Sequence, residues 1–308
     1  MKIRIGTRGS KLALWQANHV ASLLEENGVE TEIVTISTKG DKILNVSIAK
    51  IGSKGVFTEE IETALAGGEI DIAVHSAKDM PSTLPPGFTL IAFTKRERPN
   101  DVLISHLPEL DWEKSQDEII VGTSSTRRKA LLKHYYPHVK TVEMRGNLQT
   151  RIKKMQHGDC HALLLAYAGV NRMGYNHMMA HQFSSEQFVP AVGQGSIAIE
   201  IHQQLPEDKV DLVRKAVNDR TTEILLKAER SYLERLQGGC SIPAFALAEL
   251  EADQLQLTAG IISLDGQKMI KLQQSDKLEN ALTLGARLGD TILSRGGAAI
   301  LKEIKEKP

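Results

Sequence analysis

The chain has 308 residues, 41% hydrophobic and 25% charged, as in an ordinary globular protein of two or three domains. Its 38 basic and 38 acidic residues cancel, so no bulk field attracts nucleic acid or a membrane surface, and we expect neither as a partner. The sequence enters a strand pattern at once, with no apolar leader and no membrane-length apolar run, which predicts a cytoplasmic protein.

Strand and helix patterns alternate from the start of the chain. We expect strands at residues 3–6, 31–37 and 72–74, and helices at residues 11–26 and 58–67. Ser10 is the expected N-cap of the first helix, along one face of which Leu12, Trp15, His19 and Leu23 are expected to lie. Arg8 and Asp79 therefore both follow the ends of strands.

The alternation continues through the middle of the chain. Further strands are expected at residues 88–93, 101–105, 118–121, 139–144 and 161–165, with helices after residue 122 and after residue 147. The polar segment at 95–100 and the segment at 190–195 are expected to be crossovers between domains. The pattern predicts an α/β fold with two doubly wound domains, residues 1–95 with 196–215 and residues 100–190, followed by a small α+β domain at 219–308.

Arginines gather in or just after the expected strand-end turns. They are Arg8, Arg127, Arg128, Arg145, Arg151 and Arg172. Because ligands of open α/β sheets bind beyond the carboxyl ends of the strands, and because guanidinium pairs bidentately with carboxylate or phosphate, the set indicates a cleft for a polyanion. Arg128 and Arg145 are expected to line this cleft rather than the core. Each arginine taken singly could also be a solvated surface residue.

Two further patterns suit the same cleft. The glycine and hydroxyls of residues 122–126 open a helix, which favours an anion site made of backbone N–H groups and the helix dipole. Asp79 is the unusual acidic group, able to stabilise a cation that develops during a reaction. As an Asp before a proline-containing turn, it could equally be a turn residue.

The cysteines and histidines divide into reactive and structural candidates. Cys240 follows two glycines on an expected loop and is the reactive candidate, although a structural thiol is an alternative, while Cys160 beside an apolar strand is expected to be a packed core thiol. His177 and His181 have helical spacing but no third ligand nearby, so we expect no metal site.

Seven motifs together resemble porphobilinogen deaminase. They are residues 6–16 (GTRGSKLALWQ), 49–55 (AKIGSKG), 73–79 (AVHSAKD), 122–128 (GTSSTRR), 145–147 (RGN), 190–195 (PAVGQG) and 238–240 (GGC). They follow the order of the family from the start of the chain to about residue 245. After Cys240, Ile242-Pro243 fits the family, whereas Ala244-Phe245 stands where members often have Ile-Gly.

The resemblance implies a fold and an activity. It implies three domains, the first two hinged like type II periplasmic binding proteins, and a dipyrromethane cofactor attached to Cys240 by a thioether. On this primer four porphobilinogen units are deaminated and joined, each through an azafulvene cation, before water releases the linear tetrapyrrole hydroxymethylbilane. It further implies a monomer of haem biosynthesis.

The resemblance also assigns residues to roles. Asp79 would be catalytic, accepting pyrrole N–H bonds and stabilising the cation. The cofactor would be held by Cys240, Arg8, Ser10, Ser76, Lys78, Thr123, Ser124, Ser125, Arg127, Arg128, Arg145 and Gly146. The substrate would be held by Arg8, Arg145, Arg151, Arg172 and Gln194. Lys50, Lys54 and Phe57 would belong to a lid, for which residues 39–55 are rich in glycine and lysine.

A second function class fits the same cleft. A non-catalytic anion-binding or ligand-sensing protein could use two such domains, because a fold alone does not fix a function. Cys240 discriminates between the two, since a pure binding protein has no use for a covalently attached pyrrole primer.

Overall fold

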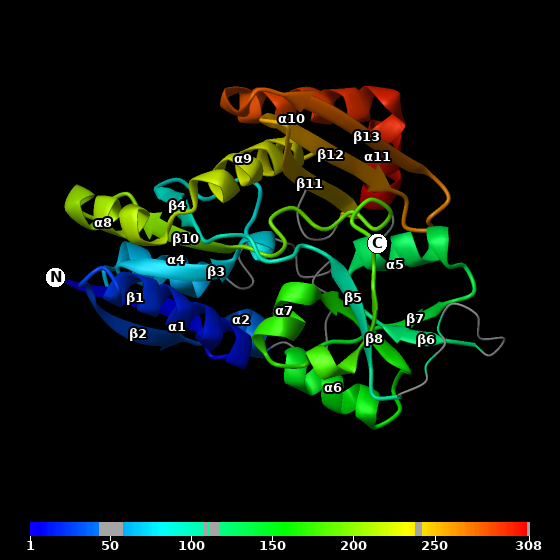
Figure 1. Cartoon of the computed structure of the whole chain (residues 1–308), viewed down its shortest axis with the longest axis horizontal. Helices are drawn as coiled ribbons and strands as arrows, with labels where there is room; N and C mark the ends of the chain where they lie inside the picture. The colour runs from blue at the N-terminus through cyan, green and yellow to red at the C-terminus, as the bar shows by residue number, and fades with distance from the viewer. Residues whose placement is uncertain (43–57, 108–109, 111, 113–117, 238–241, 307–308) are drawn as a thin grey trace. The chain divides into compact units, whose positions relative to one another are not determined.

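The computed structural model describes residues 1–42, 58–107, 110, 112, 118–237 and 242–306 (Figure 1). It divides into two compact units. Unit 1 comprises Met1–Glu97 and Gly195–Ile224, and unit 2 comprises Arg98–Gln194 and Leu225–Pro308.

Unit 1 is built on a five-stranded mixed sheet of order β2-β1-β3-β10-β4. Its strands are β1 (Lys2–Arg8), β2 (Glu30–Ile36), β3 (Ile72–Ser76), β4 (Phe88–Phe93) and β10 (Ile197–His202). Its helices are α1 (Lys11–Glu25), α2 (Lys39–Lys42), α4 (Glu59–Ala66), the 3₁₀ turn η1 (Ala77–Asp79) and α8 (Glu207–Val217). β1 pairs in parallel with β2 and β3, and β10 returns antiparallel between β3 and β4.

Apolar residues cover both faces of this sheet. On one face, α1 and α8 pack against the strands through residues such as Val20, Leu24 and Val213. On the other, α4 contributes Ile61 and Leu65. Such burial is the main stabilising term for a layered α/β unit.

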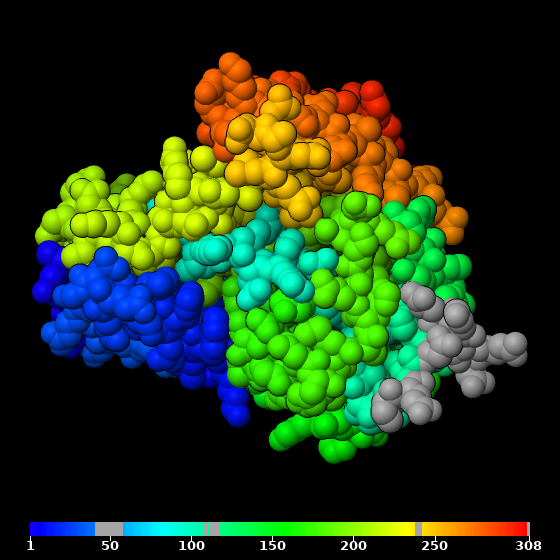
Figure 2. Space-filling view, viewed as in Figure 1, coloured from blue at the N-terminus to red at the C-terminus, as the bar shows by residue number. Residues whose placement is uncertain are grey.

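The face of α1 that carries Trp15 and His19 is not the face that the helix buries. Ala17, Val20 and Leu24 are buried, whereas Trp15 is 36% exposed and stacks on the exposed His19 at a centroid distance of 5.3 Å. Small alanines let the helix approach the sheet, so the largest side chains of the periodic pattern lie outside. Figure 2 shows this N-terminal segment (blue) at the surface.

Unit 2 contains a second five-stranded sheet, of order β7-β6-β8-β5-β9. Its strands are β5 (Asp101–Ser105), β6 (Ile120–Gly122), β7 (Lys140–Val142), β8 (Ala162–Ala166) and β9 (Met179–Gln182). Its helices are α5 (Thr126–Tyr135), α6 (Leu148–Gln156), α7 (Tyr167–Arg172) and the 3₁₀ turn η2 (Asn176–Met178). The plan repeats that of unit 1, because β6 is parallel to β7 and β8 while β5 returns antiparallel between β8 and β9.

The C-terminal part of unit 2 is a three-stranded antiparallel sheet with helices. It comprises α9 (Arg220–Arg235), which starts in unit 1, β11 (Ala244–Glu251), β12 (Gln254–Ile262), β13 (Met269–Asp276), η3 (Leu278–Asn280), α10 (Ala281–Ile292), a π-turn η4 (Leu293–Gly297) and α11 (Ala298–Glu306). A Cβ at Gly285 would lie 2.2 Å from the Ala228 carbonyl oxygen, so glycine lets α10 approach α9 closely. Phe245 and Leu247 of β11 share a core with Leu164 and Phe183.

The expected α/β fold with a small C-terminal α+β part is confirmed. Each large sheet is mixed, since a returning antiparallel strand follows the parallel pairs. Among the helices that the structure describes, none combines the length and the apolar character needed to cross a membrane.

Candidate active site

In unit 1, Arg8 and Asp79 lie at the same edge of the sheet. β1 and β3 run in parallel, with Ile5 opposite Ile72 and Gly6 opposite Ala73, so their carboxyl ends share that edge. Arg8 is the last residue of β1, and η1 with Lys78 and Asp79 directly follows β3. The prediction that Asp79 follows a strand end is confirmed, whereas β1 runs two residues beyond the expected strand and ends at Arg8 itself.

Neutral hydrogen bonds fix this edge. The Ser10 side chain accepts from the Ala13 N–H at 3.2 Å and so caps α1. Buried Gln16 donates from Nε2 to the Ser76 hydroxyl at 2.8 Å, which ties α1 to the end of β3. Asp79 itself is exposed. A rigid edge therefore presents a solvent-facing carboxylate.

In unit 2, hydroxyls surround the start of α5 at the carboxyl end of β6. Ser125 caps the helix by accepting from the Arg128 N–H, and the Ser124 hydroxyl donates to the Met144 carbonyl at 2.9 Å. A Cβ at Gly122 would lie 2.7 Å from Leu163 and 2.9 Å from Cys160, so only glycine fits here. The expected helix-terminal turn is present, with the geometry that favours anions.

Arg127 and Arg128 form a buried ionic hub with Asp101 and Gln194. Arg127 Nη2 lies 2.6 Å from Asp101 Oδ2, and Arg128 donates to Asp101 Oδ1 from Nε at 3.0 Å and from Nη2 at 2.7 Å. Gln194 Nε2 donates to Asp101 Oδ1 at 2.9 Å and to the Pro99 carbonyl at 2.6 Å. Burial alone would raise the pKa of Asp101, but the two guanidinium charges lower it well below its usual range.

This hub corrects the expectation that Arg128 lies outside the core. Arg127 is 4% exposed, Arg128 is 7% exposed and Gln194 is 1% exposed. The physical reason is the buried carboxylate of Asp101, which requires cationic and amide donors around it. Whether Arg127, Arg128 and Gln194 contact a ligand stays a prediction.

Arg145 and Arg151 lie beyond the end of β7, at the start of α6. Arg145 Nε lies 3.9 Å from Glu143 Oε2, and Arg151 Nε donates to the Gly146 carbonyl at 2.7 Å. Gly146 has φ +113°, and a Cβ there would lie 2.8 Å from Thr150, so the tight turn requires glycine. Asn147 caps α6 by accepting from the Thr150 N–H at 2.9 Å.

The remaining predicted residues are placed as follows. Arg172 is half-buried at the end of α7, which follows β8, and Thr123 is buried in the turn before α5. Lys50, Lys54, Phe57 and Cys240 lie outside the described residues.

Two secondary predictions have separate outcomes. Cys160 is a packed core thiol, 1% exposed, and burial raises its pKa to about 11, as expected for an unreactive cysteine. The helical spacing of His177 and His181 was wrong, because His177 lies in η2 and His181 in β9. Among the residues described, no cluster of histidine, cysteine and carboxylate side chains could hold a metal ion.

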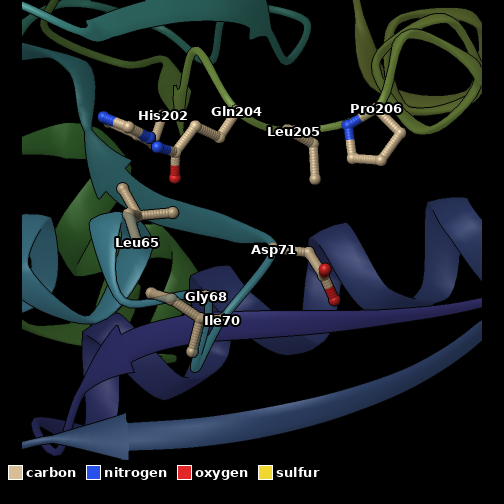
Figure 3. A pocket seen from close by; sticks show the side chains of 8 residues that line it. All are labelled: Leu65, Gly68, Ile70, Asp71, His202, Gln204, Leu205 and Pro206. Carbon is tan, nitrogen blue, oxygen red and sulfur yellow. The ribbon is translucent and has the colours of Figure 1, made fainter.

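A cavity of about 200 Å³ lies at the other end of β3, near the start of the strand (Figure 3). It is lined by Leu65, Gly68, Ile70, Asp71, His202, Gln204, Leu205 and Pro206. The Asp71 carboxylate is bound by Arg4 at 3.0 Å and by Lys209 at 2.8 Å. This cavity therefore contains none of the predicted site residues.

Sequence reasoning missed several residues that build these edges. Gln16 and Asp101 are buried polar residues within apolar elements, and that anomaly was visible in the sequence. Glu229 is fully buried in α9, where it accepts from the Gly193 and Ala248 N–H groups, each at 2.8 Å. Lys129 and Glu143, which pair beside Arg145, gave no signal because exposed charges are common.

Family models cover most of the chain. Residues 3–209 match "Porphobilinogen deaminase, dipyromethane cofactor binding domain", and residues 224–294 match "Porphobilinogen deaminase, C-terminal domain".

Curated relatives named porphobilinogen deaminase match over essentially their whole length. That of Desulfosudis oleivorans is 54% identical over 307 residues, covering 100% of this chain and 99% of the relative. Those of Cytophaga hutchinsonii and Syntrophomonas wolfei are 53% and 45% identical, each over 99% of this chain and over 97% and 99% of the relative. Among solved structures, the Bordetella pertussis BvgS VFT2 domain is similar at TM-score 0.44 and 15% identity, over 75% of this chain and 91% of that one, a level from which we conclude nothing. On the family models and the curated relatives, the chain belongs to the porphobilinogen deaminase family.

Proposed function

We propose that this protein is a hydroxymethylbilane synthase, a transferase of tetrapyrrole biosynthesis. It deaminates four porphobilinogen units, joins them head to tail and releases the linear tetrapyrrole. The observation that carries the proposal is the exposed carboxylate of Asp79, held with Arg8 and Lys78 at one sheet edge in a chain of this family.

The donors at the two edges suit the substrate. Porphobilinogen carries an acetate and a propionate, so its recognition requires cations and hydroxyls rather than metal ligands. The proposed carboxylate-binding cations are Arg8 on unit 1 and Arg145, Arg151 and Arg172 on unit 2. In the buried hub, the one carboxylate of Asp101 offsets only one of two guanidinium charges, so Arg127 and Arg128 favour nearby anions even without direct contact.

The same donors fit the family's dipyrromethane cofactor, whose two pyrroles carry four carboxylates. When bound, this group supplies a pyrrole α-carbon nucleophile on which the chain of pyrroles is built. Cys240 is the proposed thioether attachment point. Ser10, Ser76, Lys78, Thr123, Ser124, Ser125, Arg127, Arg128, Arg145, Gly146, Arg8 and Gln194 are the proposed carboxylate-holding and supporting residues.

Asp79 carries the chemical step in this proposal. As ammonia leaves the substrate, positive charge develops on the pyrrole, and a fixed carboxylate stabilises that charge without reorganisation. Asp79 also accepts the pyrrole N–H and can take up the proton released when the new bond forms. The hydrogen bond between Gln16 and Ser76 acts in support, because it holds the end of β3 from which Asp79 projects.

Several finer points belong to the same proposal. We assign the domains as residues 1–95 with 196–215, 100–190 and 219–308, and the protein as a cytoplasmic monomer. Lys50, Lys54 and Phe57 are proposed lid residues. The competing function, a non-catalytic anion sensor, would not require a covalently attached primer.

Intact-protein mass spectrometry tests the function. We expect freshly purified protein to exceed its sequence mass by two linked pyrroles. Cys240→Ser should lack the adduct, and the matched control Cys160→Ser should retain it, since that thiol is buried with a raised pKa. An adduct mapped to Cys160 would overturn the assignment of Cys240 as the attachment point. Unmodified wild-type protein that consumes no porphobilinogen would favour the anion sensor.

A further inference from the structure

The carboxylate of Glu143 covers two cations at the anion-binding edge of unit 2. Glu143 directly follows β7, and its side chain is 58% exposed, whereas the side chains of Lys129 and Arg145 are each 24% exposed. Lys129 Nζ hydrogen-bonds to Glu143 Oε1, and Arg145 Nε lies 3.9 Å from Oε2. The outermost charge of this cluster is therefore negative, although both groups beneath it are positive.

The cluster adjoins the hydroxyls at the start of α5. Lys129 lies in the first turns of that helix, and the Ser124 hydroxyl bonds to both the carbonyl and the N–H of Met144, the residue after Glu143. Partial burial would raise the pKa of Glu143, but hydrogen bonds from Lys129 and Ser124 and the charges of Lys129 and Arg145 lower it below its usual value. Glu143 is thus ionised at neutral pH and offsets one of the two positive charges beside it.

We infer that Glu143 is a displaceable counter-ion, which occupies Lys129 and Arg145 until a carboxylate of the pyrrole substrate replaces it. The inference deepens the proposed function, and it adds Lys129 to the carboxylate-binding set. Ion pairs this exposed are weak and exchange readily, because solvent screens them. Asp101, which is fully buried, cannot be displaced from Arg127 and Arg128 in the same way.

Glu143 competes with the substrate carboxylate, so the affinity for substrate is lower than the two cations alone would give. Removing the charge of Glu143 removes a competitor and leaves both cations in place. Glu143→Gln should therefore lower the KM for porphobilinogen by about 1.5- to 5-fold, the range that corresponds to an exposed ion pair. Potassium chloride should raise the KM of the variant more steeply than that of the wild type, since the net positive charge of the cluster is larger and salt screens it.

A matched control is provided by the opposite edge of the same strands. Glu118 precedes β6 and pairs with Lys140 at the start of β7, and both side chains are exposed. Glu118→Gln makes the same charge change away from the proposed site and should leave KM unchanged. In the double variant Glu143→Gln/Lys129→Gln, the lowering of KM should disappear, because the cation that Glu143→Gln makes available is then missing.

A second measurement does not depend on turnover. Calorimetric binding of inorganic phosphate should be tighter for Glu143→Gln by a similar factor and unchanged for Glu118→Gln. This pattern in a protein that does not consume porphobilinogen would leave the counter-ion role standing while the proposed function fails. An unchanged or higher KM and unchanged phosphate binding in Glu143→Gln, or an equal gain in Glu118→Gln, would overturn the inference.

Discussion

The two large sheets have the same strand plan, yet their carboxyl edges differ in how charge is arranged. In unit 1 the edge is tied by neutral groups, Gln16 and Ser76, and Asp71, one of its buried carboxylates, lies at the other end of β3 with Arg4 and Lys209. In unit 2 the buried carboxylate Asp101 lies at the carboxyl edge itself, because it begins the antiparallel strand β5 opposite Ala166.

This difference separates two tasks. At the edge of unit 1, no buried arginine pair among the described residues holds the exposed Asp79, which suits its proposed role of stabilising a cation. The edge of unit 2 contains more cations than carboxylates and suits the binding of acids. Under the proposed function, the carboxylate that stabilises the developing cation therefore belongs to unit 1, and the larger share of the carboxylate-binding cations belongs to unit 2.

The largest expected effect concerns the buried hub of unit 2. Asp101→Asn leaves two buried guanidiniums without their carboxylate, so we expect a loss of about 3–5 kcal/mol in the free energy of unfolding. Urea unfolding followed by circular dichroism measures it. Asp290→Asn, which removes an exposed pair with Arg235, should cost less than about 1 kcal/mol. Equal stability of the two variants would mean that the hub does not hold unit 2 together.

The next largest effect distinguishes an arginine inside the hub from one outside it, by comparing KM and stability. Arg145→Ala removes a partly exposed cation, so we expect the KM for porphobilinogen to rise by about 10- to 100-fold, the value of a charge-assisted bond of about 1.5–3 kcal/mol. Its urea midpoint should stay near that of the wild type. Arg128→Ala should instead lower that midpoint, since it leaves Asp101 partly unpaired. If Arg145→Ala proved the less stable of the two, the division between the hub and the exposed cations would be lost.

The smallest expected effect concerns the ion pairs of Asp71 with Arg4 and Lys209 in unit 1. Burial alone would raise the pKa of Asp71, but hydrogen bonds from Arg4 and Lys209 lower it from 3.8 to about 2. Because the pKa is depressed in the folded state, this carboxylate contributes stability above its unfolded value near 3.8, and that contribution disappears as the pH falls toward about 2. Urea midpoints of wild type and Asp71→Asn should therefore differ at about pH 7 and converge between about pH 4 and pH 2. A difference that is constant with pH would assign the effect to packing.

The sequence was sufficient for much of the fold and for part of the site. Periodicity located β4, β5 and α1 closely, and the strand-end rule placed Arg8 and Asp79 at one edge. The periodic face of α1 is not its buried face, which uses alanines while Trp15 stays exposed. Periodicity also missed β9 and α8, whose short or charged sequences give weak patterns.

The pairing of charges could not be obtained from spacing. Arg127 and Arg128 are adjacent to each other and follow a strand, which predicts cations at an edge. Their burial depends on Asp101 and Gln194, which are brought beside them by the antiparallel return of β5 and by the 190–195 crossover. Such contacts between distant segments depend on the sheet order, which no local pattern reveals.

The division of labour between the two edges is tested most directly by measuring ammonia release from porphobilinogen for Asp79→Asn and Arg145→Ala side by side. Asp79→Asn keeps shape and an acceptor oxygen but removes the charge, so we expect kcat to fall by about 10² to 10³ with little change in stability or KM. Arg145→Ala should mainly raise KM. A turnover of Asp79→Asn within about threefold of the wild type would contradict the account and make Asp79 an ordinary turn residue.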